Sequence, residues 1–277
     1  MNGDGKLDLL TANNNSNNIS VRLGVGDGSF TTPAVSTFTA GAGPNDLAVG
    51  DLNGDQKLDV VVVNNGSSNV SILLGNGDGS FQAQASGGAT GAQPNAIILA
   101  DFNNDQKLDF ATADLNGNNA TVRLGNGNGG FGVGFSPMQV TLPMDLVAGD
   151  FNSDKKLDLV TANTGVGTVR LALGAGDGTF INAATPAVST GASNRSIAAG
   201  DFNLDGFLDL AVTNVAASNV SILLGSGDGT FAVMQPFPVG AQPSHISVAD
   251  VNGDGLLDLL TTDQSAGAAV VRLGQCS

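Results

Sequence analysis

The feature that most constrains this chain is an Asp-rich motif that returns about every fifty residues. Full copies are DLNGDQKLD from Asp51, DFNNDQKLD from Asp101, DFNSDKKLD from Asp150, DFNLDGFLD from Asp201 and DVNGDGLLD from Asp250. A clipped copy, MNGDGKLD, opens the chain. The Asn of each copy falls at residue 2, 53, 103, 152, 203 or 252, so successive copies lie 49 to 51 residues apart. Such a period is typical of propellers, solenoids and repeat arrays.

Two further signals share this period. Turns of the type Gly-x-Gly-Asp-Gly-x-Phe end at Phe30, Phe81, Phe131, Phe180 and Phe231, the third with Asn in place of Asp. Asp-Gly and Asn-Gly between apolar runs favour tight β-hairpins, because both residues tolerate a positive φ. A Gly-Ala-x-Pro signal occurs at 41–44, 91–94 and 240–243 and is looser at 140–143 and 191–194.

Between these markers each repeat holds four short segments. In the second repeat they cover residues 46–51, 58–65, 69–75 and 81–91. They have strand length, are β-branched or alternating, and show no helical period. Four strands per repeat predict an all-β fold, a β-propeller of four-stranded antiparallel blades. The second segment, the most apolar, should lie between neighbouring blades, and the irregular fourth should form the outer edge.

The predicted domain is a single propeller over residues 1–277, with six repeats of about fifty residues starting near 1, 51, 101, 150, 201 and 250. The first repeat lacks the innermost strand and the last stops after its third. We therefore expect the chain to be a fragment of a longer secreted protein, with a signal peptide not present in this sequence. Closure of the ring and the number of blades that close it stay open.

The Asp-rich loop presents oxygen atoms at positions 1, 3, 5 and 9 and a main-chain carbonyl at position 7. Its first five positions match the start of an EF-hand loop, and hard oxygen ligands in a flexible loop select Ca²⁺. The predicted metal ligands of the five full loops are Asp51, Asn53, Asp55, Lys57, Asp59, Asp101, Asn103, Asp105, Lys107, Asp109, Asp150, Asn152, Asp154, Lys156, Asp158, Asp201, Asn203, Asp205, Phe207, Asp209, Asp250, Asn252, Asp254, Leu256 and Asp258. A sixth, weaker or absent site would use Asn2, Asp4, Lys6 and Asp8.

The alternative is that these loops are Asx-type turns that hold no ion. Gly occupies position 6 in three copies, whereas Gln56, Gln106 and Lys155 take its place elsewhere, which leaves the turn geometry there open. Leu at position 8, in all six copies, should point into the core and anchor the loop. The Asp residues of the Gly-Asp-Gly turns are interpreted as turn residues.

Composition limits the function classes. The chain has 25 acidic and 10 basic residues, a net charge of −15, no Trp, no Tyr and one Cys. An acidic balance without a basic stripe argues against nucleic acid and anionic membranes as partners. No apolar run is long enough to insert into a bilayer. All the acids are Asp, the shorter acid that suits turns and metal loops.

These signals together resemble the FG-GAP/VCBS repeat family, the β-propeller type of integrin α-chain headpieces and many secreted bacterial proteins. The resemblance covers the whole chain and implies Ca²⁺ in the loop of Asp51, Asn53, Asp55 and Asp59 and in the matching positions of the next four copies. In integrins the resembling face meets ligand. The family usually closes seven blades, and this chain shows six copies.

We expect a non-catalytic extracellular or cell-surface binding or adhesion module, monomeric, with structural Ca²⁺. Its ligand, a protein or a glycan, would bind on the face opposite the Asp loops, where the copies differ most. That face carries the loops between the second and third strands and the strand starts at Asn45-Asp46, Asn95, Met144-Asp145, Arg195 and Ser244-His245. Divergent loops on one face are where a binding site is built.

Two alternatives remain. One is the propeller of a polysaccharide-active enzyme of the lyase type, for which only His245 and the non-loop acids Asp46, Asp114, Asp145 and Asp263 are available for acid–base work. The other is a structural spacer in a longer secreted protein. The absence of Trp and Tyr, on which sugars commonly stack, weakens a lectin interpretation.

Overall fold

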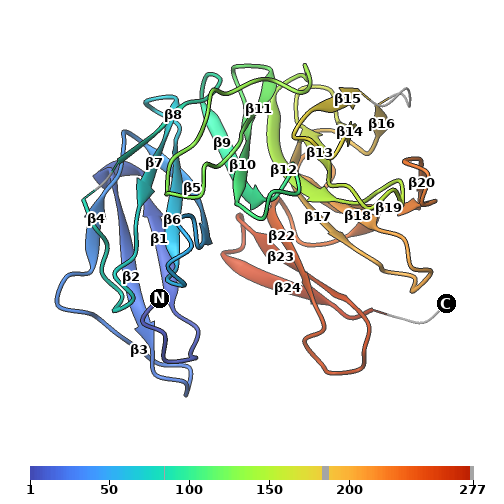
Figure 1. The fold of residues 1–277 in the computed structure, drawn as a ribbon. Helices are drawn as coiled ribbons and strands as arrows, with labels where there is room; N and C mark the ends of the chain where they lie inside the picture. The colour runs from blue at the N-terminus through green and yellow to red at the C-terminus, as the bar shows by residue number, and fades with distance from the viewer. Residues whose placement is uncertain (84, 183–186, 275–277) are drawn as a thin grey trace. The chain divides into compact units, whose positions relative to one another are not determined.

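The computed structural model describes residues 1–83, 85–182 and 187–274 of the chain. Its contacts divide into two compact units, Met1–Ser136 and Pro137–Ser277, and each is treated by itself below. Figure 1 shows the order of the strands along the chain. Among these described residues all regular elements are strands except one short 3₁₀ turn, η1, at Asn14–Ser16. No helix among the described residues is long and apolar enough to cross a membrane.

The first unit contains three antiparallel sheets. The first sheet runs β1-β2-β3, with β4 also on β2. The second runs β5-β6-β7-β8 and the third β9-β10-β11. The bounds are β1 Leu9–Asn13, β2 Asn18–Gly24, β3 Phe30–Thr31, β4 Thr37–Thr39, β5 Pro44–Gly50, β6 Asp59–Asn64, β7 Asn69–Leu73, β8 Ala85–Ala89, β9 Pro94–Ala100, β10 Asp109–Asp114 and β11 Asn119–Arg123.

The second unit also contains three antiparallel sheets. They run β12-β13-β14-β15 with β16 also on β14, β17-β18-β19-β20 with β21 also on β19, and β22-β23-β24. The bounds are β12 Pro143–Gly149, β13 Asp158–Asn163, β14 Thr168–Gly174, β15 Phe180–Asn182, β16 Val188–Ser189, β17 Asn194–Gly200, β18 Asp209–Asn214, β19 Asn219–Gly225, β20 Phe231–Val233, β21 Phe237–Pro238, β22 Pro243–Ala249, β23 Asp258–Asp263 and β24 Ala268–Arg272.

These six sheets are blades of a β-propeller, and the predicted fold class is confirmed. The outermost rank is irregular, as expected: it is split into two short strands in three sheets, and in the third sheet it is reduced to isolated bridges at Phe131 and Phe135. The two incomplete repeats are also confirmed for the described residues. The first sheet begins with a second-rank strand, and the last sheet ends with a third-rank strand.

The second strand of each blade after the first is the most buried because its side chains enter two different cores. In β6, Val60 and Val62 pack in one cluster with Ile19 and Val21 of the preceding blade. Val61 and Val63 pack in another cluster with residues of the following blade such as Phe110. Successive strand residues point to opposite faces, so an uninterrupted apolar run fits a strand covered on both sides.

A polar residue ends this second strand in every blade, and it is buried in all of them except the first, where Asn13 is half-buried. Asn64 donates through its Nδ2 to Asn69 Oδ1 and Ser71 Oγ, both at 2.9 Å, and it is fully buried. Its Oδ1 accepts the Gly41 N–H of the preceding blade at 3.0 Å. This amide thus connects two strands of its own sheet and the loop that leads into it.

In the third blade an acid replaces this amide. Asp114 is fully buried and accepts the hydroxyl groups of Thr112 and Thr121 at 2.9 and 2.6 Å. Burial raises the pKa of Asp114 to about 6. A carboxylate cannot donate as the amide does, and Asn119 Oδ1, the counterpart of Asn69 Oδ1, is buried without a hydrogen-bond partner.

We predict that Asp114→Asn stabilises the protein at neutral pH. The folded-state pKa lies above the unfolded value, so the wild-type chain loses stability as the pH rises from about 4 to above 6. The loss could reach about 3 kcal/mol, since each pKa unit corresponds to about 1.4 kcal/mol. Thermal melts of both proteins from pH 4 to pH 8 should therefore show a difference in melting temperature that grows as the pH rises.

The matched control is Asp263→Asn, at the same position of the last blade. Asp263 accepts N–H and hydroxyl donors from Ser265, and that side-chain hydrogen bond is the largest influence holding its pKa below the usual value. This variant should give no neutral-pH gain. A gap for Asp114→Asn that is the same at every pH would contradict the explanation.

Candidate functional site

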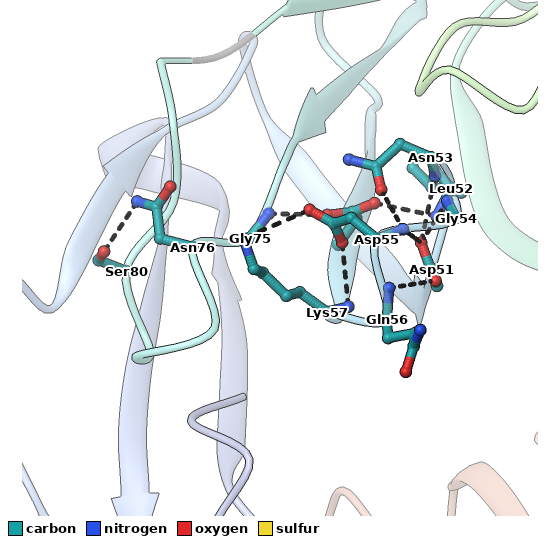
Figure 2. Close-up of polar contacts among 11 residues, drawn as sticks. Asp51, Leu52, Asn53, Gly54, Asp55, Gln56, Lys57, Gly75, Asn76 and Ser80 are labelled. Atoms are coloured by element: carbon teal, nitrogen blue, oxygen red, sulfur yellow. Dashed lines mark hydrogen bonds and ion pairs between the residues drawn. The ribbon is translucent and has the colours of Figure 1, made fainter.

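Each full Asp-rich loop joins the innermost strand of a blade to its second strand. Figure 2 shows the loop between β5 and β6, in which side-chain oxygen atoms face main-chain N–H groups of the same turn. Asp51, at position 1, accepts N–H groups of Asn53, Gly54 and Asp55 on Oδ1 at 3.2, 2.7 and 3.2 Å. Its Oδ2 accepts the Gln56 N–H at 2.7 Å. The first Asp therefore winds the loop around its own carboxylate.

Positions 3 and 5 continue this winding. Asn53 Oδ1 accepts the Asp55 N–H at 2.9 Å, and Asp55 Oδ1 accepts the Lys57 N–H at 3.0 Å. Both are Asx-type turns, which explains why short Asp and Asn occupy these positions. The Lys57 ammonium lies 3.5 Å from Asp55 Oδ2, an exposed pair that contributes little.

The acid at position 9 has a different setting. Asp59 is fully buried, and its Oδ2 accepts the Leu52 N–H at 2.9 Å. Its Oδ1 accepts the Gly75 N–H at the end of the third strand, at 2.7 Å. One carboxylate thereby ties the start of the loop, the second strand and the third strand together. The same pair of bonds recurs at Asp109, Asp158, Asp209 and Asp258.

The glycine in this clamp is a structural residue that the sequence analysis did not single out. A Cβ on Gly75 would collide with the Leu58 carbonyl oxygen, and the equivalent glycines meet the equivalent carbonyl in the same way. Only Gly allows the third strand to come this close to the loop. The signal was present, because Gly follows this strand in all six copies, at residues 24, 75, 125, 174, 225 and 274.

The electrostatics reflect these surroundings. Burial raises the pKa of Asp59, against two N–H donors, and the nearby carboxylates of Asp55 and Asp51 raise it further. The same causes raise the pKa of Asp109 and Asp209, and that of Asp158 to about 6. Burial alone would raise the pKa of Asp51, but four main-chain N–H groups hold this pKa below its usual value.

The structure places the predicted ligands in these two settings. In each full loop the residues of positions 1, 3 and 5 line one turn, and the acid of position 9 lies at its base. Within residues 1–83, 85–182 and 187–274, no group of three or more Asp, Glu, His or Cys side chains is arranged to hold a metal ion. The metal assignments for all six loops therefore stay predictions.

The clipped first loop differs. Asp8 accepts the Gly24 N–H at 2.8 Å, as in the other blades, but the Met1 amino group lies 2.5 Å from its Oδ2. Burial alone would raise the pKa of Asp8, but the amino group and the Gly24 N–H hold this pKa below its usual value. A positive charge now stands where other copies carry a main-chain N–H.

The turn geometry at position 6 is the same in copies with and without Gly. Gln56, Gln106 and Lys155 have φ of 64°, beside 88° and 84° for Gly206 and Gly255. Position 4 is also left-handed in every copy, and there Leu204 has φ of 59° with 60% of its surface exposed. The hydrogen bonds to the first Asp thus fix the turn even where the residue disfavours it.

The expectation for Leu at position 8 is wrong in two copies. Leu7 and Leu58 are 91% and 44% exposed. Leu108 instead packs beside Gly50, at the end of the innermost strand of the preceding blade, and Leu208 and Leu257 pack beside Gly149 and Gly200. This leucine anchors the loop only through a neighbouring blade, and the first blade has no innermost strand among the described residues.

The Gly-Asp-Gly acids are turn residues, as interpreted. Asp78 Oδ1 accepts both the N–H and the hydroxyl of Ser80, at 2.9 and 2.6 Å. Asp27, Asp177 and Asp228 make the same two bonds. They lie outside the Asp-rich loops and form no further cluster.

At the opposite ends of the innermost strands, two acids are structural. Asp46 Oδ2 accepts the Ile97 N–H of the next blade at 3.0 Å, and Asp145 accepts the Ile197 N–H at 3.0 Å. Asp145 also accepts the Ser196 hydroxyl at 2.8 Å. These acids therefore connect adjacent innermost strands, a role that their position at variable strand starts did not reveal.

Other strand-start residues are exposed to solvent. Asn45 donates to the Asn95 carbonyl at 2.7 Å, and Arg195 donates to Gln264 Oε1 at 3.4 Å. His245 is exposed, and its Nδ1 lies 3.3 Å from Ser196 Oγ, while Ser196 is 2% exposed. Amide, guanidinium and imidazole groups at these positions can bind a polar ligand.

A scan against protein-family models matches the chain to the FG-GAP-like repeat at residues 1–62, 51–112, 101–161, 150–212 and 201–261. No curated protein matches it. Solved structures match its fold. A lectin from Agrocybe aegerita, described as recognising non-reducing terminal N-acetylglucosamine, has a TM-score of 0.65 at 16% identity, over 94% of this chain and 72% of the lectin.

Two further structures have other descriptions. A candidate 6-phosphogluconolactonase from Bacteroides uniformis matches with a TM-score of 0.65 at 15% identity, over 95% of this chain and 80% of its own. The V. cholerae biofilm matrix protein Bap1 matches with a TM-score of 0.55 at 18% identity, over 91% of this chain and 40% of its own. At these identities the likeness shows the fold alone.

We predict that Leu204→Asn stabilises the fourth full loop. Leu204 is exposed in the left-handed region, which costs a non-Gly residue about 1–2 kcal/mol. Asn tolerates this conformation better, and Asn104 already occupies the same position with φ of 58°. The free energy of unfolding should rise by roughly 0.5–1 kcal/mol in urea titrations.

The control is Leu224→Asn, which changes the same residue type on β19, outside the left-handed region. It should not stabilise the protein. A loss of stability in Leu204→Asn would show that its apolar contacts outweigh the backbone strain.

Proposed function

Because the chain belongs to the FG-GAP-like repeat family, we propose that it is a Ca²⁺-binding β-propeller that acts outside the cell as a non-catalytic binding or adhesion module. The observation that carries the proposal is the loop that recurs in five full copies. In each, side-chain oxygen atoms of positions 1, 3 and 5 lie on one turn above a buried fourth.

The residues fit this ion. The donors are carboxylate, amide and main-chain oxygen atoms, the ligands of Ca²⁺ in flexible loops. In the second blade they would be Asp51, Asn53, Asp55, the Lys57 carbonyl and Asp59. The carboxylates already lie close enough that Asp55 and Asp51 raise the pKa of Asp59. A bound cation would offset this repulsion, so we propose a structural role for Ca²⁺.

The first loop is the weakest candidate for this role. Positions 2 to 9 of this loop lie within the sequence, whereas the full set of donors is present in the other five copies. We therefore propose five Ca²⁺ sites, in the loops that begin at Asp51, Asp101, Asp150, Asp201 and Asp250.

We propose the ligand site on the face opposite the Asp loops, within either unit. Asn45 with Asn95, and Arg195 with Gln264, provide polar groups there. A protein or a glycan fits these groups. The lectin likeness is compatible with a glycan, while the absence of Trp and Tyr from this chain leaves hydrogen bonding as the means of sugar recognition.

Two of the acids on this face, Asp46 and Asp145, are held in structural hydrogen bonds between strands, which favours a non-catalytic role over the alternative enzyme. An activated serine donates its hydroxyl proton toward a histidine base. Ser196 instead donates to Asp145, is buried, and lies at the longer distance of 3.3 Å from His245. This arrangement connects strands and leaves no exposed nucleophile at Ser196.

We predict that EDTA lowers the melting temperature of the protein and that added Ca²⁺ restores it. Binding to the folded state alone stabilises it by about 2.7 kcal/mol per site at a hundredfold excess of ligand over Kd. Differential scanning calorimetry with metal analysis measures both effects. An unchanged melt in EDTA, with no Ca²⁺ retained after dialysis, would disprove the calcium proposal.

Two variants in one blade distinguish the loss of a metal ligand from the loss of a negative charge alone. Asp205→Asn removes a predicted ligand charge, and Asp228→Asn removes a turn charge where the third copy already carries Asn128. Asn keeps the Oδ1 acceptor that binds the N–H of Phe207 or Thr230. Asp205→Asn should lower the Ca²⁺ content by about one ion, because one loop binds one ion, and Asp228→Asn should leave it unchanged.

The binding proposal is tested separately on glycan and protein arrays in Ca²⁺ buffer. We predict that Arg195→Ala or Asn45→Ala weakens binding of the ligand found, because these polar groups are exposed on the proposed face. Lys57→Ala, in an Asp loop, is the control. If only Lys57→Ala loses binding, the ligand binds on the face of the Asp loops, and the proposed face is wrong.

A further inference from the structure

The five full Asp-rich loops differ in the side chain at position 7. In three of them this residue is Lys57, Lys107 or Lys156, and in the other two it is Phe207 or Leu256. Position 7 contributes only its main-chain carbonyl to the predicted site, so its side chain can vary without loss of a donor. The loops therefore share one set of oxygen donors and divide into a Lys class and a Lys-free class.

In the Lys class the ammonium group lies beside a predicted metal ligand. Lys57 Nζ is 3.5 Å from Asp55 Oδ2, and Figure 2 shows the two side chains together. The same ion pair recurs in the next two loops, at 3.1 Å for Lys107 with Asp105 and 3.7 Å for Lys156 with Asp154. The acid in each pair is the position-5 ligand of its loop. A positive charge is thus already paired with a carboxylate that the proposed Ca²⁺ would use.

The Lys-free loops have a different partner at this carboxylate. The sequence contains no Lys or Arg at 201–209 or at 250–258. Asp205 Oδ2 accepts the neutral side-chain amide of Asn203 at 2.9 Å, and the last loop makes the same bond at 2.9 Å. No basic residue of these two loops offsets the charge of their three Asp residues.

The position-7 side chain packs over the Gly-Asp-Gly turn in both classes. A Cβ on Gly77 would lie 3.1 Å from Lys57 Cδ, so the Lys stem lies against this glycine. The Phe207 ring lies against Gly227 in the same way. The turn holds this side chain in place, and the charge at its end is what differs between the classes.

Position 6 also differs between the classes, but the turn does not change with it. Gln56 and Gly206 have φ of 64° and 88°. The N–H of each donates to Oδ2 of the position-1 Asp, at 2.7 and 2.9 Å. The first carboxylate is therefore held alike in both classes, and the Lys charge is the difference that acts on a cation.

We propose that the position-7 Lys competes with Ca²⁺ for the position-5 carboxylate and divides the five sites into two affinity classes, an inference that rests on the proposed Ca²⁺ sites. The loops with Phe207 and Leu256 bind Ca²⁺ more tightly than the loops with Lys. Calcium loops tune their affinity through the charge of their ligands. The expected difference in Kd is on the order of tenfold, because one nearby unit charge changes the energy of a divalent ion by this order at an exposed site.

The two classes are distributed unevenly over the two units. Both full loops of the first unit, at Asp51 and Asp101, carry Lys, whereas two of the three loops of the second unit do not. As the free Ca²⁺ concentration falls, the first unit therefore loses its ions while the second unit keeps two.

The test is a titration of the whole chain with radioactive Ca²⁺ by equilibrium dialysis at low ionic strength. The wild-type protein should bind two ions in a tighter class and three in a weaker class, as the loops divide. Lys57→Met keeps an unbranched stem over Gly77 without the charge, so it should shift one ion into the tighter class. Phe207→Lys should shift one ion into the weaker class. Circular dichroism checks the fold of each variant.

Gln56→Gly is the matched control in the same loop as Lys57. It should leave the two classes as in the wild type, because the turn already has the conformation found with Gly206. Added NaCl should narrow the difference between the classes. The three Lys side chains are 41 to 45% exposed, and salt screens exposed charges.

The outcomes distinguish this inference from the calcium proposal. A wild-type protein that binds no Ca²⁺ overturns both. Five bound ions in a single affinity class overturn the inference alone, and so does a distribution that Lys57→Met leaves unchanged. If Phe207→Lys fails to fold, Lys57→Met still decides, because it removes only an exposed charge.

Discussion

The rest of the structure depends on the buried carboxylate at position 9 of each repeat. It accepts one N–H from the start of its loop and one from the glycine that ends the third strand, so three segments of a blade meet at one side chain. The cost is visible in the raised pKa of Asp59, Asp109, Asp158 and Asp209. A buried anion with good donors is stable only while all of its bonds are kept. This explains the fixed Asp and Gly, sixteen residues apart, in every copy.

Neighbouring blades also depend on each other for the burial of their apolar side chains. The second strand β6 has no solvent-facing side, because Val60 and Val62 belong to one core and Val61 and Val63 to the next, and β10, β13 and β18 are buried along their whole length as well. The turn Phe and the position-8 Leu also reach into a neighbouring blade. A repeat cannot bury its apolar faces alone, so each end of such an array exposes one.

The sequence predicted the fold class, the rank order of the strands and the incomplete first and last sheets, because these follow from period, turn chemistry and strand length. It also predicted that the Gly-Asp-Gly acids are turn residues, which the bonds of Asp78 confirm. It was wrong about Leu7 and Leu58, because their burial needs the innermost strand of a preceding blade beside them. It did not recognise Asp46 and Asp145 as connections between innermost strands, because their partners lie about fifty residues away.

The sequence by itself determined the local geometry of this protein. A carboxylate at position 1 and Asx residues at positions 3 and 5 bond N–H groups within five residues, so the loop turns alike with Gly206 or with Gln56 at position 6. The tertiary structure alone decided which identical residues are buried and which are exposed. Leu58 and Leu108 carry the same motif, yet only Leu108 packs beside the glycine of a preceding innermost strand. The hydrogen bonds of a loop depend only on residues of the same repeat, whereas the burial of its leucine depends on the preceding repeat.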